Sequence, residues 1–199
     1  STGYADAINE MDVVKEQGRA TGANVLVNIA KIQESHAFGT FAALFGDVPF
    51  SETNKGAENP NPAFDDQVTI YDSIQDSLGA AASALEDYQT NSSVPLSIAF
   101  GDTELDLFYG ADVSKWIKLA YSLKARYHLH QGEYQDALDA ANQGLDSADD
   151  NWIAPHGTSF GSDTNLWYNF FALRVGYLTA EDAYAPQLLD IQNPSEYRG

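Results

Sequence analysis

The feature that most restricts the fold is a helix-forming segment over 113–130 that is apolar on more than one side. A helix with one apolar stripe can lie on a surface, but a helix that is apolar around most of its circumference must be enclosed by other elements. The segment therefore predicts a central, buried helix that Gly132 ends. The residues that give this pattern are Trp116, Ile117, Leu119, Ala120, Leu123, Ala125, Tyr127 and Leu129.

Other segments with helical periodicity can enclose this central helix. Apolar residues three or four apart predict helices over 4–16, with Gly18 beyond its end, and over 23–45, ended by Gly46. A third helix begins at Asp65 or Asp66 and ends near Tyr88, and later segments predict helices over 134–145, 166–173 and 181–189. The buried face expected on the third helix holds Val68, Tyr71, Ile74, Leu78, Ala81 or Ala82, and Leu85.

Small residues indicate that the helices on either side of Gly132 pack closely, so 113–147 is predicted to be one tetratricopeptide-like helix pair. Such a pair cannot bury its own faces and must stack on the helices at 23–45 and 64–88. The predicted fold is all-α, with tetratricopeptide-like helix pairs and long irregular loops at 51–63, 89–111 and 149–165. A plain antiparallel helix pair would show the same spacing of Tyr121, Ala125, His128, Gly132, Ala137, Ala141 and Gly144.

Two of these loops contain patterns that allow more than one interpretation. Val94, Leu96, Ile98 and Phe100 alternate with other residues, which is compatible with a short strand. Asp102, Glu104 and Asp106 also alternate, as calcium ligands do. As a calcium loop of the EF-hand type the segment fails, because Leu107 takes the place of the glycine and Val113 that of the last glutamate.

Charge and composition exclude several classes of function. The chain carries 29 acidic and 10 basic residues, a net charge of −19, so it lacks the basic surface that nucleic acid or an anionic membrane requires. There is no cysteine, and His36, His128, His130 and His156 do not form a zinc pattern. No catalytic triad or phosphate-binding loop is present, and no carboxylate pair stands out among the many acids. We therefore expect no bound metal or cofactor, and a glycosidase that uses two of the many acidic residues stays open as an alternative function.

Aromatic residues in the last third of the chain suggest a ligand site. Trp152, Trp167 and Tyr168 can stack on the apolar faces of sugar rings, and Asn165 can hydrogen-bond to sugar hydroxyls. These four residues are the predicted ligand contacts. The alternative is that the same aromatic residues fill the helix bundle or face another part of the fold.

Two separate segments resemble one known family. The first is AALFGDVPFSE at 42–52, followed by NPAFDDQ at 61–67, and the second is DLFYG at 106–110, followed by DVSKWIKLAYSLKAR at 112–126. Over residues 23 to 147 the chain resembles the SusD/RagB family of Bacteroidetes outer-membrane lipoproteins, especially its SusD-like branch. In the first segment, Gly46, Asp47 and Pro49 are interpreted as scaffold residues of a turn.

The resemblance implies a helical, non-catalytic surface protein. Family members bind glycans or other nutrients, are tethered to the outer membrane by an N-terminal lipid, and deliver their ligand to a SusC-like TonB-dependent transporter. Because they are usually more than twice this length, the 199 residues are expected to form part of a single SusD-like domain. The lipid-bearing N-terminal region and much of the irregular half would then lie outside this chain. A helix-repeat interaction scaffold without a small ligand is the alternative function.

Overall fold

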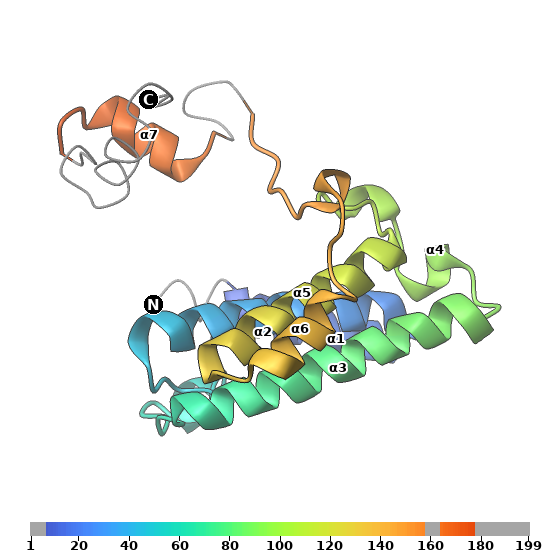
Figure 1. Cartoon of the computed structure of the whole chain (residues 1–199), viewed down its shortest axis with the longest axis horizontal. Coiled ribbons are helices and arrows are strands. Elements are labelled where there is room, and N and C mark those ends of the chain that lie inside the picture. Colours follow the sequence, from blue (N-terminus) through green and yellow to red (C-terminus); the bar gives the residue numbers. More distant parts are fainter. Residues whose placement is uncertain (1–6, 158–163, 178–199) are drawn as a thin grey trace. The chain divides into compact units, whose positions relative to one another are not determined.

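A computed structural model describes residues 7–157 and 164–177, and the chain divides into two units, Ser1–Ile153 and Ala154–Gly199. Among the described residues the structure is all-α, with no strand and only an isolated bridge between Val48 and Asp65. The second unit contributes α7 (Leu166–Leu173). The first contributes α1 (Asn9–Thr21), α2 (Asn24–Phe45), α3 (Gln67–Asn91), α4 (Leu96–Ala99), α5 (Val113–Gln131) and α6 (Tyr134–Ala141), as Figure 1 shows.

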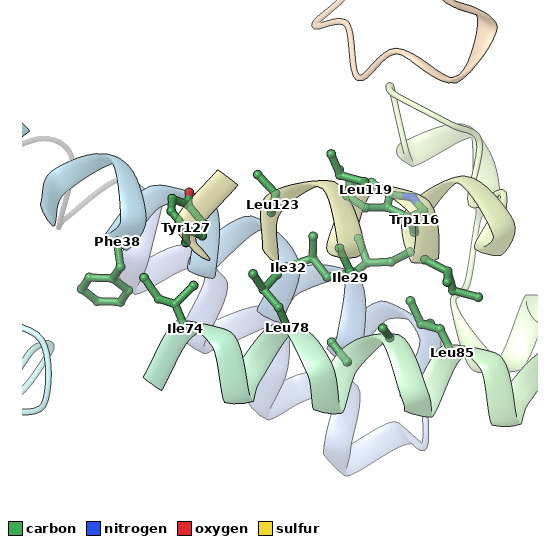
Figure 2. Close-up of a cluster of buried hydrophobic side chains, with 14 of the residues drawn as sticks. Ile29, Ile32, Phe38, Ile74, Leu78, Leu85, Trp116, Leu119, Leu123 and Tyr127 are labelled. Carbon is green, nitrogen blue, oxygen red and sulfur yellow. The ribbon is translucent and has the colours of Figure 1, made fainter. Parts of the chain in front are cut away.

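The hydrophobic core of the first unit lies between α2, α3 and α5. In Figure 2, side chains of α5 and α3 point toward one another, with Ile29 and Ile32 of α2 between them. Trp116 of α5 and Leu78 of α3 are fully buried. The prediction of a central helix at 113–130 is therefore confirmed, apart from Leu129, which is exposed in the last turn. No helix within the described residues is long and apolar enough to cross a membrane.

Gly39 of α2 lies directly against the ring of Tyr127 of α5. A Cβ atom at this position would lie 2.2 Å from the Cζ of Tyr127, so only glycine fits under the ring. The Tyr127 ring also stacks on Tyr71 of α3, with 5.7 Å between centroids, and burial raises the pKa of its phenol to about 12. One tyrosine thus joins the three helices of the core.

Helices α5 and α6 pack against each other across a turn at Gly132, and the assignment of 113–147 to one tetratricopeptide-like pair stays a prediction. Gly132 adopts a φ of 79° after α5, and the N–H of Glu133 donates to the carbonyl of His128 at 2.9 Å. A Cβ at Gly144 would lie 2.5 Å from Oγ of Ser122, which confirms the close approach. The predicted end at Leu145 is wrong, because α6 ends at Ala141 and a turn then brings Gly144 against α5.

Predicted boundaries of two other helices need correction. α1 continues to Thr21, and Gly22, at φ 76°, follows its end. Gly18 is buried inside the helix and does not end it. A Cβ at Gly18 would lie 2.7 Å from the Val27 side chain. Tyr4, the predicted start, and the helix predicted at 181–189 fall outside the described residues. α3 continues to Asn91, and Val68 is 58% exposed rather than buried, because it lies in the first turn beyond the core.

The loops contain helical turns instead of the short strand considered at 94–100. Residues 96–99 form α4. The N–H groups of Ile98 and Ala99 both donate to the carbonyl of Pro95, which precedes the helix. Single 3₁₀ turns, η2 (Gly56–Glu58), η3 (Thr103–Leu105) and η4 (Ala148–Asp150), lie in the other connections. The alternation of apolar residues at 94–100 was misleading because it is too short to separate a strand from one helical turn.

Reciprocal hydrogen bonds fix the junction between α2 and α3. Oδ1 of Asp47 accepts from the N–H of Gln67 at 3.1 Å, and Nε2 of Gln67 donates to the carbonyl of Ala42 at 2.7 Å. Each helix end therefore satisfies a backbone group of the other. The Asp65 carboxylate accepts from the N–H groups of Phe50 and Ser51. The side chains of Asp47 and Asp65 thus hold the turn after α2 against the start of α3, which agrees with the scaffold role predicted for this turn.

Candidate ligand-binding site

Trp152, one of the predicted ligand contacts, packs into an aromatic cluster of the first unit. Its ring lies 5.1 Å from His36, 5.1 Å from Phe108 and 6.1 Å from Trp116, measured between centroids. The side chain is only partly buried, and its Nε1 donor has no partner among the described residues. Burial in this cluster lowers the pKa of His36 below its usual range.

Asp106 orders the loop that carries this cluster. Its carboxylate accepts hydrogen bonds from the N–H groups of Phe108 at 3.0 Å and Ala111 at 2.8 Å, and from Nε1 of Trp116 at 2.7 Å. Ala111 has a φ of 60°, which is unusual for a residue with a side chain. Both Asp106 oxygens already accept from protein donors, and Asp102 accepts from the N–H of Glu104, so these two of the three alternating acids act as turn caps.

Two lysines of α5 hold the segment that precedes Trp152. Nζ of Lys118 contacts Asp146 at 2.7 Å and Asp150 at 2.8 Å, and Lys115 donates to the carbonyl of Asp149 at 2.8 Å. The hydrogen bond from Lys118 holds the pKa of Asp150 below its usual value. The Tyr109 hydroxyl donates to the Asp150 carbonyl at 2.6 Å, so Trp152 is held near α5 by its neighbours.

The other three predicted contacts lie together at the start of α7 in the second unit. The side chain of Asn165 caps the helix, with Oδ1 accepting from the N–H of Trp167 at 2.9 Å and of Tyr168 at 3.4 Å. The side chains of Trp167 and Tyr168 are 67% and 59% exposed. Asn165 thus uses its carbonyl oxygen to begin the helix, and the two aromatic rings are available to a ligand. The predicted bounds of this helix are confirmed.

An apolar cleft of about 280 Å³ opens in the first unit between α1, α2 and the 100–108 segment. Its polar groups include Gln33 and Asp102, which are few for a site that must match many sugar hydroxyls. The cleft is suited to an apolar group. Sequence reasoning missed it because its walls come from three separate segments: Met11 and Val14, Leu26 and Ile29, and Leu105 and Leu107.

One group of side chains in the described part of the chain has the ligand types that a metal ion needs. Ligand atoms of His128, Glu133 and Asp136 lie within 4.8 Å of one another at the α5–α6 turn. Nδ1 of His128 and Oε2 of Glu133 are 2.6 Å apart and form a hydrogen-bonded pair. The two acids also lie at the positive end of α6 and the histidine at the negative end of α5, so helix dipoles already account for their placement.

Comparisons with known proteins agree on one family. The model of the SusD-like family, described as starch-binding and associating with the outer membrane, matches residues 1–191. A solved SusD/RagB family protein from Bacteroides thetaiotaomicron is 28% identical, with a TM-score of 0.65, over 84% of this chain and 34% of that chain. A SusD homolog from Parabacteroides distasonis is 26% identical, with a TM-score of 0.61, over 84% and 32% of the two chains.

A third similar structure is described as a chitin-binding protein. It is 27% identical, with a TM-score of 0.60, over 76% of this chain and 32% of that chain. The chain therefore spans about a third of the length of these three solved structures. A comparison with curated proteins gives no match.

Proposed function

This chain belongs to the SusD-like family, and from that premise we propose that it is a non-catalytic surface protein that captures oligosaccharides or other nutrients. The observation that carries the proposal is the family match over residues 1–191, which includes both the helix unit and α7. Two descriptions give further support. The family is described as starch-binding, and one similar solved structure is described as a chitin-binding protein. Both polymers are neutral glycans.

The proposed partner is a SusC-like TonB-dependent transporter in the outer membrane, to which the protein would deliver its ligand. Association of the family with the outer membrane supports this part of the proposal. We propose that a lipid anchor tethers the protein at the cell surface and that the 199 residues form part of one SusD-like domain. The tightly packed α2, α3 and α5 give a rigid surface on which a transporter could dock.

The proposed ligand platform is the start of α7. Trp167 and Tyr168 are exposed aromatic residues in adjacent positions, and Asn165 fixes the helix that carries them. An aromatic face binds the apolar face of a pyranose ring, while amide groups bond its hydroxyls. Trp152 would make a less accessible contact, because it is partly buried in the aromatic cluster of the first unit.

Isothermal titration of the protein with a malto-oligosaccharide and a chito-oligosaccharide tests the proposed function. We expect binding of at least one of the two, weakened by Trp167→Ala and Tyr168→Ala by about tenfold each, the usual loss for a stacking residue. Tyr177→Ala is the matched control, because Tyr177 is an exposed aromatic residue of the same unit outside α7. Absence of binding to any glycan would contradict the proposal.

The alternative, a helix-repeat scaffold without a small ligand, is favoured by the close packing of the α5–α6 pair. Capture of the tagged protein from detergent-solubilised outer membranes distinguishes the two functions. A nutrient-delivery protein should bring down a TonB-dependent transporter and also bind a glycan. A scaffold should bind proteins in the same experiment and give no heat with either oligosaccharide.

A further inference from the structure

A hollow of about 580 Å³ lies in the first unit, lined by residues of the loop that joins α2 to α3 and by Asn9 of α1. Its volume falls within the range of about 300–1,000 Å³ that is common for ligand pockets. The side chains of Asn9, Glu52, Lys55 and Asn59 line it. Three prolines, Pro49, Pro60 and Pro62, form apolar parts of its wall.

Hydrogen bonds hold the wall of this hollow in place. Oε2 of Glu52 accepts from the N–H of Ala63 at 3.0 Å and from the side-chain amide of Asn59 at 2.9 Å, which closes the loop across eleven residues. The side-chain amide of Asn54 donates to Asp12 and joins the loop to α1. A ligand would therefore meet a wall that is already ordered, and it would lose little affinity to the ordering of the loop.

Lys55 differs from every other lysine of the chain. Its side chain makes no ion pair or hydrogen bond among the residues that the structure describes, although the chain has 29 acidic residues. The other five lysines are each bonded to an oxygen of the protein: Lys15, Lys31, Lys115, Lys118 and Lys124. An ammonium group that no described residue bonds, in a hollow of an acidic protein, has its donors available for a ligand.

Glu52 offers the complementary acceptor. Both of its hydrogen bonds use Oε2, so Oε1 has no hydrogen bond from any described residue. The N–H of Ala63 and the amide of Asn59 lower the pKa of this carboxyl, so it is ionised at neutral pH. The hollow therefore holds one positive and one negative group and is close to neutral overall.

We propose that this hollow binds a neutral saccharide through adjacent hydroxyl groups, which donate to Oε1 of Glu52 and accept from the ammonium of Lys55. A hydroxyl can donate and accept at once, so a pair of opposite charges suits a diol better than it suits an ion. The net charge of −19 also repels acidic glycans. The inference rests on the proposed function and adds a binding site in the first unit to the platform proposed on α7.

Titration of the protein with the malto- and chito-oligosaccharides, and with an oligogalacturonate, tests the site. Lys55→Met and Glu52→Gln should each raise the Kd for a neutral glycan by about tenfold or more, the loss expected for a hydrogen bond to a charged group. Glu52→Gln keeps an oxygen that can accept from Ala63, so the loop should stay closed. Lys31→Met, which removes the same charge outside the hollow, should leave the Kd unchanged.

The outcomes separate this inference from the proposed function. If the unchanged protein, Lys55→Met and Glu52→Gln all bind a neutral glycan with equal affinity, the hollow is not a saccharide site, and the proposed function still holds. Failure of the unchanged protein to bind either neutral glycan overturns the hollow as a saccharide site and the glycan part of the proposed function. Tighter binding of the oligogalacturonate than of the neutral glycans overturns the diol assignment. Circular dichroism of each variant confirms that a weaker affinity does not come from unfolding.

Discussion

Two groups of aromatic residues have opposite environments in this protein. Trp116 of α5 is fully buried, with its indole N–H bonded to Asp106, whereas Trp167 and Tyr168 of α7 are exposed, with side chains for which the described residues provide no hydrogen bond. Residue type is the same in both places. The difference shows that a polar partner nearby in the sequence, here an aspartate ten residues before the tryptophan, is a better sign of a core aromatic than composition.

The largest effect should come from removal of a buried ring. We expect Trp116→Ala to lower the free energy of unfolding by about 3–5 kcal/mol, because it leaves a cavity and removes the indole hydrogen bond to Asp106. Urea unfolding followed by circular dichroism measures the change. Trp116→Phe, which keeps much of the volume, should cost less. Equal stability of Trp116→Ala and the unchanged protein would remove the distinction between the two aromatic groups.

Removal of the polar partner should have the next largest effect. Asp106→Ala leaves the buried N–H of Ala111 and the indole N–H of Trp116 without acceptors, at a cost of about 2–3 kcal/mol. Asp102→Ala, which removes a cap from a single exposed N–H, serves as the control and should cost about 1 kcal/mol or less. The comparison fails if both alanine variants unfold at the same urea concentration.

A methyl group added under the Tyr127 ring tests how tightly the buried aromatic group is packed. Gly39→Ala should destabilise the protein by about 1–3 kcal/mol, because the new Cβ overlaps the ring. Gly79→Ala in α3 is the matched control, since its Cβ would lie 3.4 Å from the movable end of Lys124. We expect the control to be stabilising by up to about 1 kcal/mol through its higher helix propensity. Thermal unfolding of both variants gives the answer.

The buried cluster should also give a pH dependence that α7 does not. Burial, helped by the charge of Arg126, lowers the pKa of His36 in the folded protein below the value of 6.5 expected when unfolded. Below about pH 6.5 the unfolded chain binds a proton that the folded protein does not, so stability falls as the pH decreases. Melting temperatures from about pH 7.5 to 5.5 should show this slope, and His36→Gln should reduce it.

The smallest change in stability should follow removal of the exposed rings. Trp167→Ala and Tyr168→Ala should alter the free energy of unfolding by no more than about 0.5 kcal/mol, because neither ring is buried. Urea unfolding of the variants, set beside that of Trp116→Ala, measures the contrast directly. A loss above about 2 kcal/mol would show that these residues belong to a core after all.

The sequence predicted the central helices well because their signals are local and strong. The bounds of α2, α5 and α7 match to within a residue, since Gly46, Gly132 and the Asn165 cap mark ends that the chain itself encodes. α1 was displaced because Gly18 looked like a helix stop. Gly18 instead leaves room for the Val27 side chain of α2, and this contact between two helices cannot be read from the sequence around Gly18.

The candidate site was predictable only in part for the same reason. Trp167, Tyr168 and Asn165 are neighbours in sequence and therefore lie together, whereas the partial burial of Trp152 depends on His36, far earlier in the chain. The hollow beside the α2–α3 loop was missed because no composition rule distinguishes Lys55 from other lysines. Its lack of a partner becomes visible only when the contacts of all six are known.

The turn at Asp106 has a consequence for the order in which the protein folds. All of the donors that Asp106 binds lie within the next ten residues, so the turn needs no contact with a distant segment. Loops of this length close in roughly 10–100 ns, far sooner than whole helices can dock. We expect it to act as a local nucleus that sets the first turn of α5, with φ-values near Asp106 above those in α6.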